Sequence, residues 1–296
     1  MVHIGCTFYQ ALKNSTEGQD SFNGTVAVVL IVVNALASVF VILSNFTAMY
    51  TIVRTPALHS PSNVFILGLA MSDFAVGTIA QPALITIQAS AIKNNSVYFC
   101  NAVKVFEFVG WTLASVSLLT LTALTADRFL AIHFHLRYQE FVTNRRVGIV
   151  LVIIWLYGLL SGSLKIIIGK GILILHVIVL VPVAIMNVNF LLKIHLTVRR
   201  HSAEIEALQQ TAQLNMPRMK KSVKVTYLVV AAFASFYLPY ICCAGAIAIK
   251  GKETSDIVLA YRITESLVLL NSLVNPMIYY WRIEELRNAT RQLICS

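Results

Sequence analysis

Several oxygen-bearing side chains interrupt apolar stretches of this chain, where they could bind a cation. Asp73 stands inside one apolar run, and Ser117 and Asn271 stand inside two later ones. A carboxylate at membrane depth is costly, so it usually has a functional reason. Carboxylate, hydroxyl and amide oxygens are hard ligands, and these three together predict a small hydrated cluster that holds a cation. The alternative is that Asp73 is a structural acid, protonated or hydrogen-bonded.

Two further carboxylates, Glu107 and Glu265, are accompanied by aromatic residues. The aromatic residues expected beside them are Trp111, Tyr237, Tyr240 and Tyr261. Carboxylates and aromatic faces both attract ammonium and guanidinium groups, so the set predicts a pocket for a cationic group such as a basic peptide side chain. The alternative is a local salt bridge of either carboxylate with Arg262 or Lys104. A lipid is the second ligand class, because the pocket is otherwise apolar.

The stretch 101–133 is predicted to be the helix that organises these sites. At helical spacing one line of polar or small side chains runs along it: Glu107, Gly110, Ala114, Ser117, Leu121, Thr125 and Arg128. The opposite faces carry Phe106, Val109, Leu113, Val116 and Leu119. An ion near lipid needs partners or water, so we expect the polar line to face other helices.

The composition is that of a polytopic membrane protein. Of 296 residues, 57% are hydrophobic and only 12% are charged, about half the charged share of a soluble domain. Seven apolar segments are predicted at 25–53, 62–90, 101–133, 147–168, 171–197, 223–249 and 256–281, and an amphipathic piece at 283–294. The expected fold is an all-α membrane protein, a seven-transmembrane helix bundle with a short amphipathic eighth helix. Its parts would be an extracellular segment 1–23, the bundle 24–282 and the C-terminal piece 283–296.

The basic residues predict the orientation of the bundle. With the N-terminus outside, fifteen of the 23 Lys and Arg residues fall on the cytoplasmic side and eight on the outer side. The sequons at Asn14, Asn23 and Asn94 then fall outside, where each can be glycosylated. Residues 1–23 lack a signal-peptide pattern, so the first span would direct insertion into the membrane. The net charge of +10 does not indicate nucleic-acid binding, because no aromatic platforms accompany it.

Short motifs follow one another along the chain, one per predicted span. They are Ser44-Asn45, Leu69-Ala70-Met71-Ser72-Asp73, Asp127-Arg128-Phe129, Trp155, Pro182, Phe233 with Phe236-Tyr237-Leu238-Pro239, and Asn275-Pro276-Met277-Ile278-Tyr279. In order and spacing this set resembles the rhodopsin-like (class A) G-protein-coupled receptors. Residues 143–148, Glu285-Leu286-Arg287 with Cys295, and the short link at 169–171 look most like the melanocortin and adenosine receptor neighbourhood.

The resemblance implies a plasma-membrane receptor that transmits binding of an extracellular ligand, with a peptide favoured, to an intracellular heterotrimeric G protein. It assigns coupling and activation to Asp127, Arg128, Phe233, Tyr237, Pro239, Asn275, Pro276 and Tyr279. It makes the cation at Asp73, Ser117 and Asn271 a sodium ion, with no other metal or cofactor, and it makes Cys295 a candidate for palmitoylation. The alternatives are a receptor of the same fold for a lipid or small metabolite, and a binding or decoy receptor that does not couple.

This chain departs from the family pattern at several positions. Gly110 replaces the aspartate of amine receptors, and Met219 stands where many members place an acid that pairs with the arginine at Arg128. We therefore expect some basal activity. Tyr237 replaces a tryptophan and Phe190 a tyrosine, while Cys100 could either be bridged to Cys6 or carry a free thiol.

Two other classes fit the sequence poorly, so no enzymatic activity is predicted. An intramembrane enzyme would need paired acids or a His/Glu metal cluster within the spans, and the histidines show no ligand spacing. A transporter would tend to show paired repeats with broken helices, and the seven spans are unlike one another.

Overall fold

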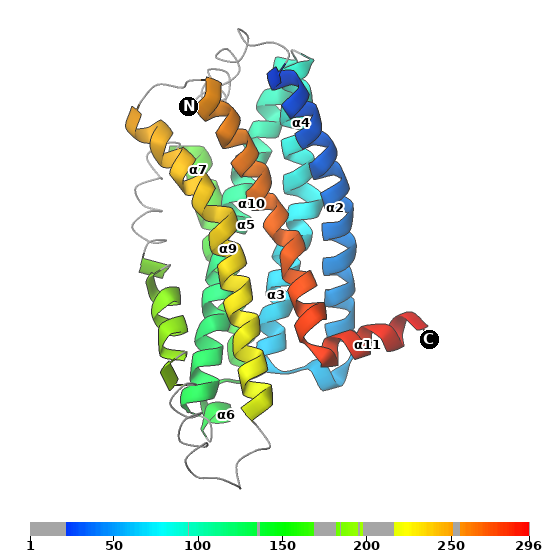
Figure 1. Ribbon diagram of the computed structural model, residues 1–296, viewed down its shortest axis with the longest axis vertical. Coiled ribbons are helices and arrows are strands. Elements are labelled where there is room, and N and C mark those ends of the chain that lie inside the picture. The colour runs from blue at the N-terminus through cyan, green and yellow to red at the C-terminus, as the bar shows by residue number, and fades with distance from the viewer. Residues whose placement is uncertain are drawn as a thin grey trace.

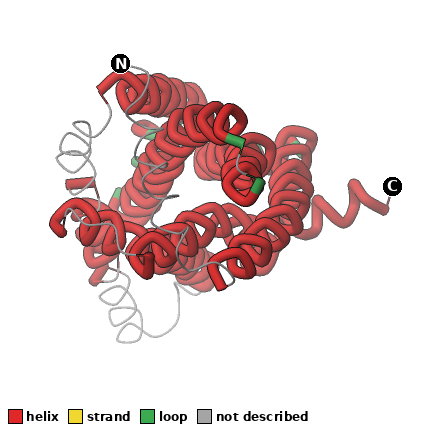
Figure 2. The backbone as a smooth tube through the Cα atoms, turned by 90° about the horizontal axis from the view of Figure 1, so that it is seen from above, coloured by secondary structure: helices red, strands yellow, loops and turns green. Residues whose placement is uncertain are grey.

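The computed structural model describes residues 22–93, 95–134, 137–168, 182–183, 185–194, 196–197, 216–250 and 255–295. Within these residues every long element is a helix. The bundle consists of α2 (Phe22–Arg54), α3 (Pro61–Ala75), η2 (Val76–Ala80), α4 (Gln81–Ile92), α5 (Ser96–His133), α7 (Asn144–Ile168), α9 (Met216–Lys250) and α10 (Ser255–Arg282). These helices run side by side along the long axis of the molecule (Figure 1) and form one bundle when seen from above (Figure 2).

The described helices have the length and composition of membrane spans. Five of them are long and apolar enough to cross a bilayer: Gly24–Arg54, Pro61–Ile92, Ser96–His133, Asn144–Ile168 and Tyr227–Ala246. A shorter apolar helix, Ile185–Ile194, falls in the predicted fifth span, of which only part is described. The seventh predicted span corresponds to α10, which is less apolar because it carries Arg262, Glu265 and several amides. The prediction of an all-helical membrane bundle is confirmed.

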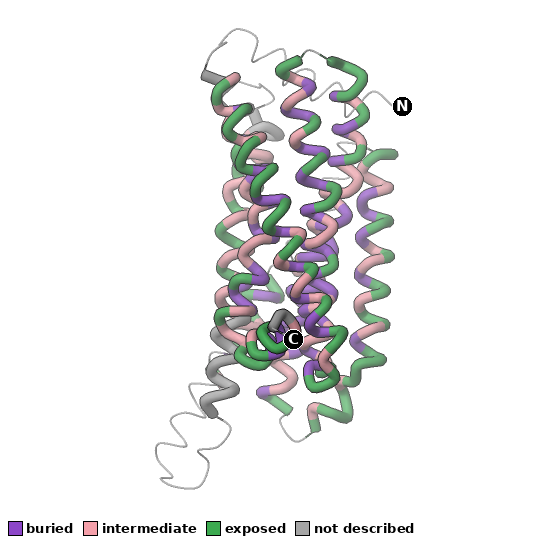
Figure 3. The backbone as a smooth tube through the Cα atoms, turned by 90° about the vertical axis from the view of Figure 1, so that its right-hand side faces the viewer, coloured by how far each residue is buried: buried purple, intermediate pink, exposed green. Residues whose placement is uncertain are grey.

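Helix α5 lies in the middle of the bundle. It contacts α3, η2 and α4 on one side, and α7 and α9 on others. Ser117 and Leu121 on its polar line are buried, but Phe106, Leu113 and Val116 are buried as well. The polar line thus faces other helices as expected, and the opposite side of α5 is buried as well, because a central helix has neighbours on several sides. The mostly buried inner faces and exposed outer faces of the helices are visible in Figure 3.

Helices α5 and α7 approach each other closely along two glycines. A Cβ added to Gly158 would lie 3.0 Å from the carbonyl oxygen of Thr112, and one added to Gly162 would lie 2.6 Å from that of Phe108. Between the two glycines, Ser161 shares a hydrogen bond with Ser115 on α5, with 3.2 Å between the hydroxyl oxygens. Small residues at a membrane helix interface let backbones pack closely in this way.

The second membrane span is not a regular α-helix throughout. Its central five residues, η2, form a widened π-helical turn, and Pro82 follows in the first turn of α4. At this widened turn the Ser38 hydroxyl of α2 donates to the carbonyl oxygen of Gly77, at 2.9 Å. Pro239 and Pro276 lie inside α9 and α10, which continue through them.

The short helix α11 (Glu284–Cys295) confirms the predicted amphipathic eighth helix. It projects sideways at the same end of the bundle as α6 (Tyr138–Phe141) and the turn η1 (Pro56–Leu58) (Figure 1). Leu286 and Ala289 on its apolar face are buried. The Thr290 hydroxyl shares a hydrogen bond with the hydroxyl of Thr51 on α2, with 3.0 Å between the oxygens. We call this end the Arg128 end and the opposite end of α5 the Glu107 end.

Candidate functional site

At the Arg128 end, Asp127 is held by two hydroxyl groups. Ser62 of α3 donates to one carboxylate oxygen at 2.5 Å, and Tyr138 of α6 donates to the other at 2.6 Å. The Nε of Arg128 is 4.0 Å from the carboxylate, too far for a direct hydrogen bond. Burial raises the pKa of the Tyr138 phenol above its ordinary value, and the bond to Asp127 acts in the same direction. Asp127 is thus fixed mainly by hydroxyls and only loosely by Arg128.

A residue that the sequence reasoning missed ties α9 to the Ile185–Ile194 helix. The Tyr227 hydroxyl donates to the carbonyl oxygen of Leu191 at 2.7 Å. Tyr227 also packs with Phe129 against Ile132 and Ile194. The sequence carries no direct signal for this bond, because its acceptor is a backbone carbonyl. Met219, in place of the usual acid, indicates only a weaker restraint on Arg128. The side chain of Met219 itself lies outside the described residues.

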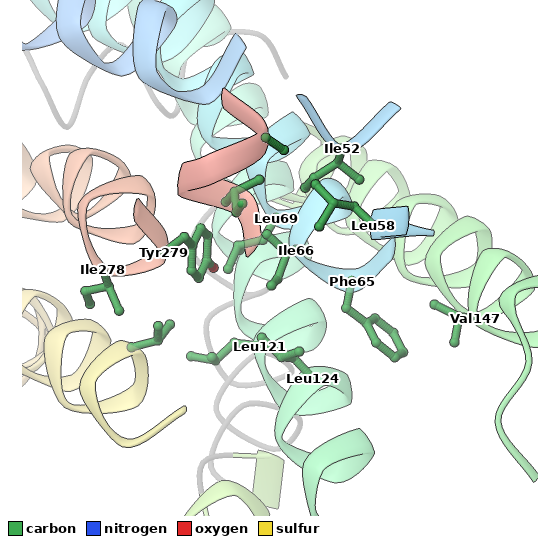
Figure 4. Packing of buried hydrophobic residues seen from close by; sticks show 13 residues of the cluster. Ile52, Leu58, Phe65, Ile66, Leu69, Leu121, Leu124, Val147, Ile278 and Tyr279 are labelled. Atoms are coloured by element: carbon green, nitrogen blue, oxygen red, sulfur yellow. The ribbon is translucent and has the colours of Figure 1, made fainter. Parts of the chain in front are cut away.

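Tyr279 is fully buried within the apolar core of the Arg128 end. Its ring lies beside Ile66 and Leu69 of α3, with Leu121 of α5 in the same cluster (Figure 4). The predicted coupling residue therefore faces the interior of the bundle here, where it is packed among aliphatic side chains.

The residues predicted to bind sodium, Asp73, Ser117 and Asn271, are all buried inside the bundle. Asn275 of α10 donates from Nδ2 to the carboxylate of Asp73 at 2.9 Å. Ser117 lies in the same layer, because its hydroxyl is 3.1 Å from that of Ser72, the neighbour of Asp73. Asn271 lies one turn before Asn275, is buried, and its amide oxygen has no hydrogen-bond partner. A buried amide oxygen without a partner is a hard ligand of the kind that a small cation takes.

At the Glu107 end, Glu107 has a cation partner on α7. The Nζ of Lys165 is 3.8 Å from a carboxylate oxygen of Glu107, and it lies 4.9 Å from the centre of the Trp111 ring. Glu107 does take part in a local ion pair, but its partner is Lys165 rather than the predicted Lys104 or Arg262.

The other predicted pocket residues lie on α9 and α10. The Tyr240 and Tyr261 hydroxyls share a hydrogen bond at 3.2 Å. Glu265, one turn further along α10, is buried, and Tyr240 lies within electrostatic range of both Glu265 and Glu107. The two carboxylates therefore act on the same residue, Tyr240.

Two smaller features complete this region. Among the described residues, no atom from elsewhere lies within 4 Å of the point where a Cβ would stand on Gly110, so no side chain packs against that position. Below it, the rings of Tyr237 and Phe233 stack at 3.9 Å between centroids, and both lie within two turns of Pro239. Two of the three predicted activation residues of α9, Phe233 and Tyr237, are therefore in direct contact.

Several predictions lie outside the described residues. They concern Asn14, Asn94 and Cys6, together with the side chains of Asn23 and Cys295, so glycosylation and palmitoylation stay predictions. Cys100 is disulfide-bonded, which excludes the free thiol, but its partner is not among the described residues. Across the described ranges no group of three His, Cys, Asp or Glu side chains is arranged to hold a metal ion.

Comparison with known proteins agrees with this arrangement. The model of the family described as "7 transmembrane receptor (rhodopsin family)" matches residues 44–171 and 170–279. Melanocortin receptor 4 of Danio rerio is 25% identical over 263 residues, covering 86% of this chain and 80% of the relative. Melanocortin receptor 3 of Homo sapiens is 25% identical over 272 residues, covering 86% and 82%. Melanocortin receptor 5 of Rattus norvegicus is 24% identical over 265 residues, covering 86% and 80%.

These relatives confirm the melanocortin part of the narrower resemblance. The adenosine part stays a prediction. The family model covers most of the chain, including the stretches that carry Asp73, Arg128 and Tyr279. The chain belongs to the rhodopsin family of seven-transmembrane receptors.

Proposed function

We propose that this protein transmits binding of an extracellular ligand to an intracellular heterotrimeric G protein across the plasma membrane, with its N-terminus outside. The observation that carries the proposal is that α5 bears Glu107 near one end and Arg128 near the other. The two residues are 21 positions apart, which spans about 32 Å of helix, enough to cross the hydrocarbon core. Because α5 packs against helices on several sides, a change at one end reaches neighbours that also line the other end.

We propose a peptide with a basic group as the ligand. Glu107, Glu265 and Trp111 provide carboxylates and an aromatic face, which attract a guanidinium or ammonium group. The names of the relatives, melanocortin receptors, support the peptide class. A lipid or a small metabolite is the second class, because the surroundings of these groups are largely apolar.

The proposed switch is a movement of α9 about Pro239. The Phe233–Tyr237 stack lies directly below this proline and above the Tyr227 hydrogen bond. A ligand shifts the bundle only by its different affinity for the two packings, so contacts of the pocket with Tyr240 of α9 would transmit the effect. A displaced α9 would expose Arg128 and Tyr279 to the G protein.

We further propose a sodium ion at Asp73, Ser117 and Asn271 that favours the resting packing. The ion would supply a positive charge between α3, α5 and α10. Two hydrogen bonds already join these helices without the ion: Asn275 of α10 donates to Asp73 of α3, and Ser117 of α5 shares a hydrogen bond with Ser72 of α3.

The test is a signalling assay in cells expressing the full chain at a measured surface level. Basic peptides, lipids and small metabolites are screened for G-protein activation, and active compounds are repeated with Glu107→Lys and Glu265→Lys. A basic peptide that loses potency in both variants supports the proposal, whereas unchanged potency removes the cationic pocket. Specific binding without activation of any G protein would make the chain a decoy receptor instead.

A further inference from the structure

A lysine of the receptor already occupies the position expected for a ligand cation. Lys165 of α7 places its Nζ 3.8 Å from the Glu107 carboxylate and 4.9 Å from the centre of the Trp111 ring. A carboxylate combined with an indole face is the environment that recognises an ammonium or guanidinium group. The exposed fractions of the two charged side chains are similar, 15% for Lys165 and 17% for Glu107. The pair is therefore largely shielded from water but still reachable.

We propose that Lys165 is a tethered competitor, which fills the cation subsite in the resting receptor and must leave it before a ligand cation can enter. This inference rests on the proposed function, because it concerns the same pocket. It adds a regulatory role for Lys165 and names the group that displaces it: a guanidinium, as carried by an arginine side chain.

The geometry of the pair favours exchange. At 3.8 Å the ammonium and the carboxylate attract each other, but they are beyond the distance of a direct hydrogen bond. A guanidinium is planar, can donate two parallel hydrogen bonds to a carboxylate, and stacks on an aromatic ring. An arginine ligand can therefore form with Glu107 and Trp111 the contacts that Lys165 makes only partly.

The carbonyl groups at the C-terminus of α7 offer the displaced lysine an alternative partner. Lys165 lies in the last turn of α7, which ends at Ile168. The last turn of a helix presents carbonyl oxygens without helical partners, and its partial negative charge attracts a cation. With four flexible carbons in its stem, the ammonium can turn towards these carbonyls when a ligand takes its position.

The competition sets the apparent affinity of the receptor for cations. If Lys165 fills the subsite for nine-tenths of the time, the ligand meets a competent site for one-tenth of it, and its apparent dissociation constant rises about tenfold. Removing the lysine charge should therefore strengthen binding of a cationic probe, whereas a lysine with only a structural role would weaken or not affect it.

The experiment measures binding rather than signalling, so its outcome does not depend on G-protein coupling. The probes are an acetylated and amidated tripeptide with a central arginine flanked by alanine, and the same tripeptide with citrulline, the uncharged isostere of arginine. Their dissociation constants are measured on the purified full-length receptor in lipid nanodiscs by the shift of its melting temperature. The variants are Lys165→Met, Lys165→Gln, Lys165→Arg, and Lys165→Met combined with Glu107→Gln.

We expect Lys165→Met and Lys165→Gln to bind the arginine probe about tenfold more tightly than the wild type, with little change for the citrulline probe. Lys165→Arg keeps a tethered cation that competes at least as strongly, so it should bind the arginine probe no more tightly than the wild type. The added Glu107→Gln should abolish the gain. Binding of the arginine probe by both lysine variants that is no tighter than wild type, or equal binding of the two probes by these variants, would overturn the proposal. The expected gain in arginine binding without G-protein activation would leave the proposal standing while removing the coupling function.

Discussion

Replacing Tyr227 with phenylalanine removes one oxygen atom, and with it the hydrogen bond between α9 and the Ile185–Ile194 helix. This bond, 2.7 Å from Tyr227 Oη to the carbonyl oxygen of Leu191, belongs to the packing described here. Tyr227 is 12 residues from Pro239, about 18 Å along the helix. A rotation of 10° about that proline would move Tyr227 by about 3 Å, which breaks a hydrogen bond. In the proposed switch the packing described here is the resting one, so the bond would stabilise only the resting state.

The size of the effect follows from the energy of one hydrogen bond. A typical intramolecular hydrogen bond contributes about 0.5–1.5 kcal/mol net. Losing it changes the ratio of active to resting receptor by a factor of about 2–12. Because the resting state dominates without ligand, basal G-protein activation by Tyr227→Phe should rise by roughly the same factor.

The assay is ligand-free second-messenger production at matched surface expression. Tyr157→Phe is the control, since it also removes a phenol hydroxyl from a membrane helix, and that hydroxyl makes no hydrogen bond within the described part of the chain. The control should signal like the wild type. Equal basal signalling by Tyr227→Phe and wild type would refute the reasoning that this bond restrains α9.

Three further predictions concern packing, sodium and the eighth helix. Gly162→Ala places a methyl group 2.6 Å from a carbonyl oxygen of α5 and should lower the melting temperature by roughly 2–8 °C, whereas Gly148→Ala, with open space around it, should not lower it. We expect basal signalling to fall when sodium replaces choline in the medium, and Asp73→Asn to remove that fall; a sodium effect that survives in this variant would contradict the proposed site. Thr51→Val and Thr290→Val should each lower the free energy of unfolding. The double variant should lose about 0.5–1.5 kcal/mol less than the sum of the two single losses, because both remove the same hydrogen bond between α2 and α11. Melting curves measure these losses, and strict additivity would contradict the hydrogen bond.

The sequence predicts the fold well because the fold depends mostly on local information. The length and hydropathy of each run decide whether it spans a bilayer, and no tertiary contact is needed for that decision. Polar residues within the runs are expected to face inwards, because a polar group that faces lipid lacks hydrogen-bond partners. Asp73, Ser117 and Asn271 are indeed buried, because lipid offers their oxygens and amides no partners.

The partners of individual side chains could not be predicted in this way. Which faces of two helices meet depends on their rotation and offset, which the packing of the whole bundle decides. Lys165 reaches Glu107 from another helix, 58 positions away in the sequence. The acceptor of the Tyr227 hydrogen bond is a backbone carbonyl, and every residue has one, so no residue type marks it. The burial of both sides of α5 follows from its central place, which hydropathy along one helix does not reveal.

The most direct test is whether G-protein activation at the Arg128 end of the bundle requires Arg128. Guanine-nucleotide exchange by a purified heterotrimeric G protein is measured with receptor in nanodiscs, using Tyr227→Phe to raise the ligand-free rate. Adding Arg128→Ala should return the rate to that of empty nanodiscs, whereas adding Arg137→Ala, which removes an exposed arginine at the same end, should leave it raised. Exchange that persists with Arg128→Ala, at equal amounts of folded receptor, would contradict the claim that α5 links a ligand pocket to a G-protein site.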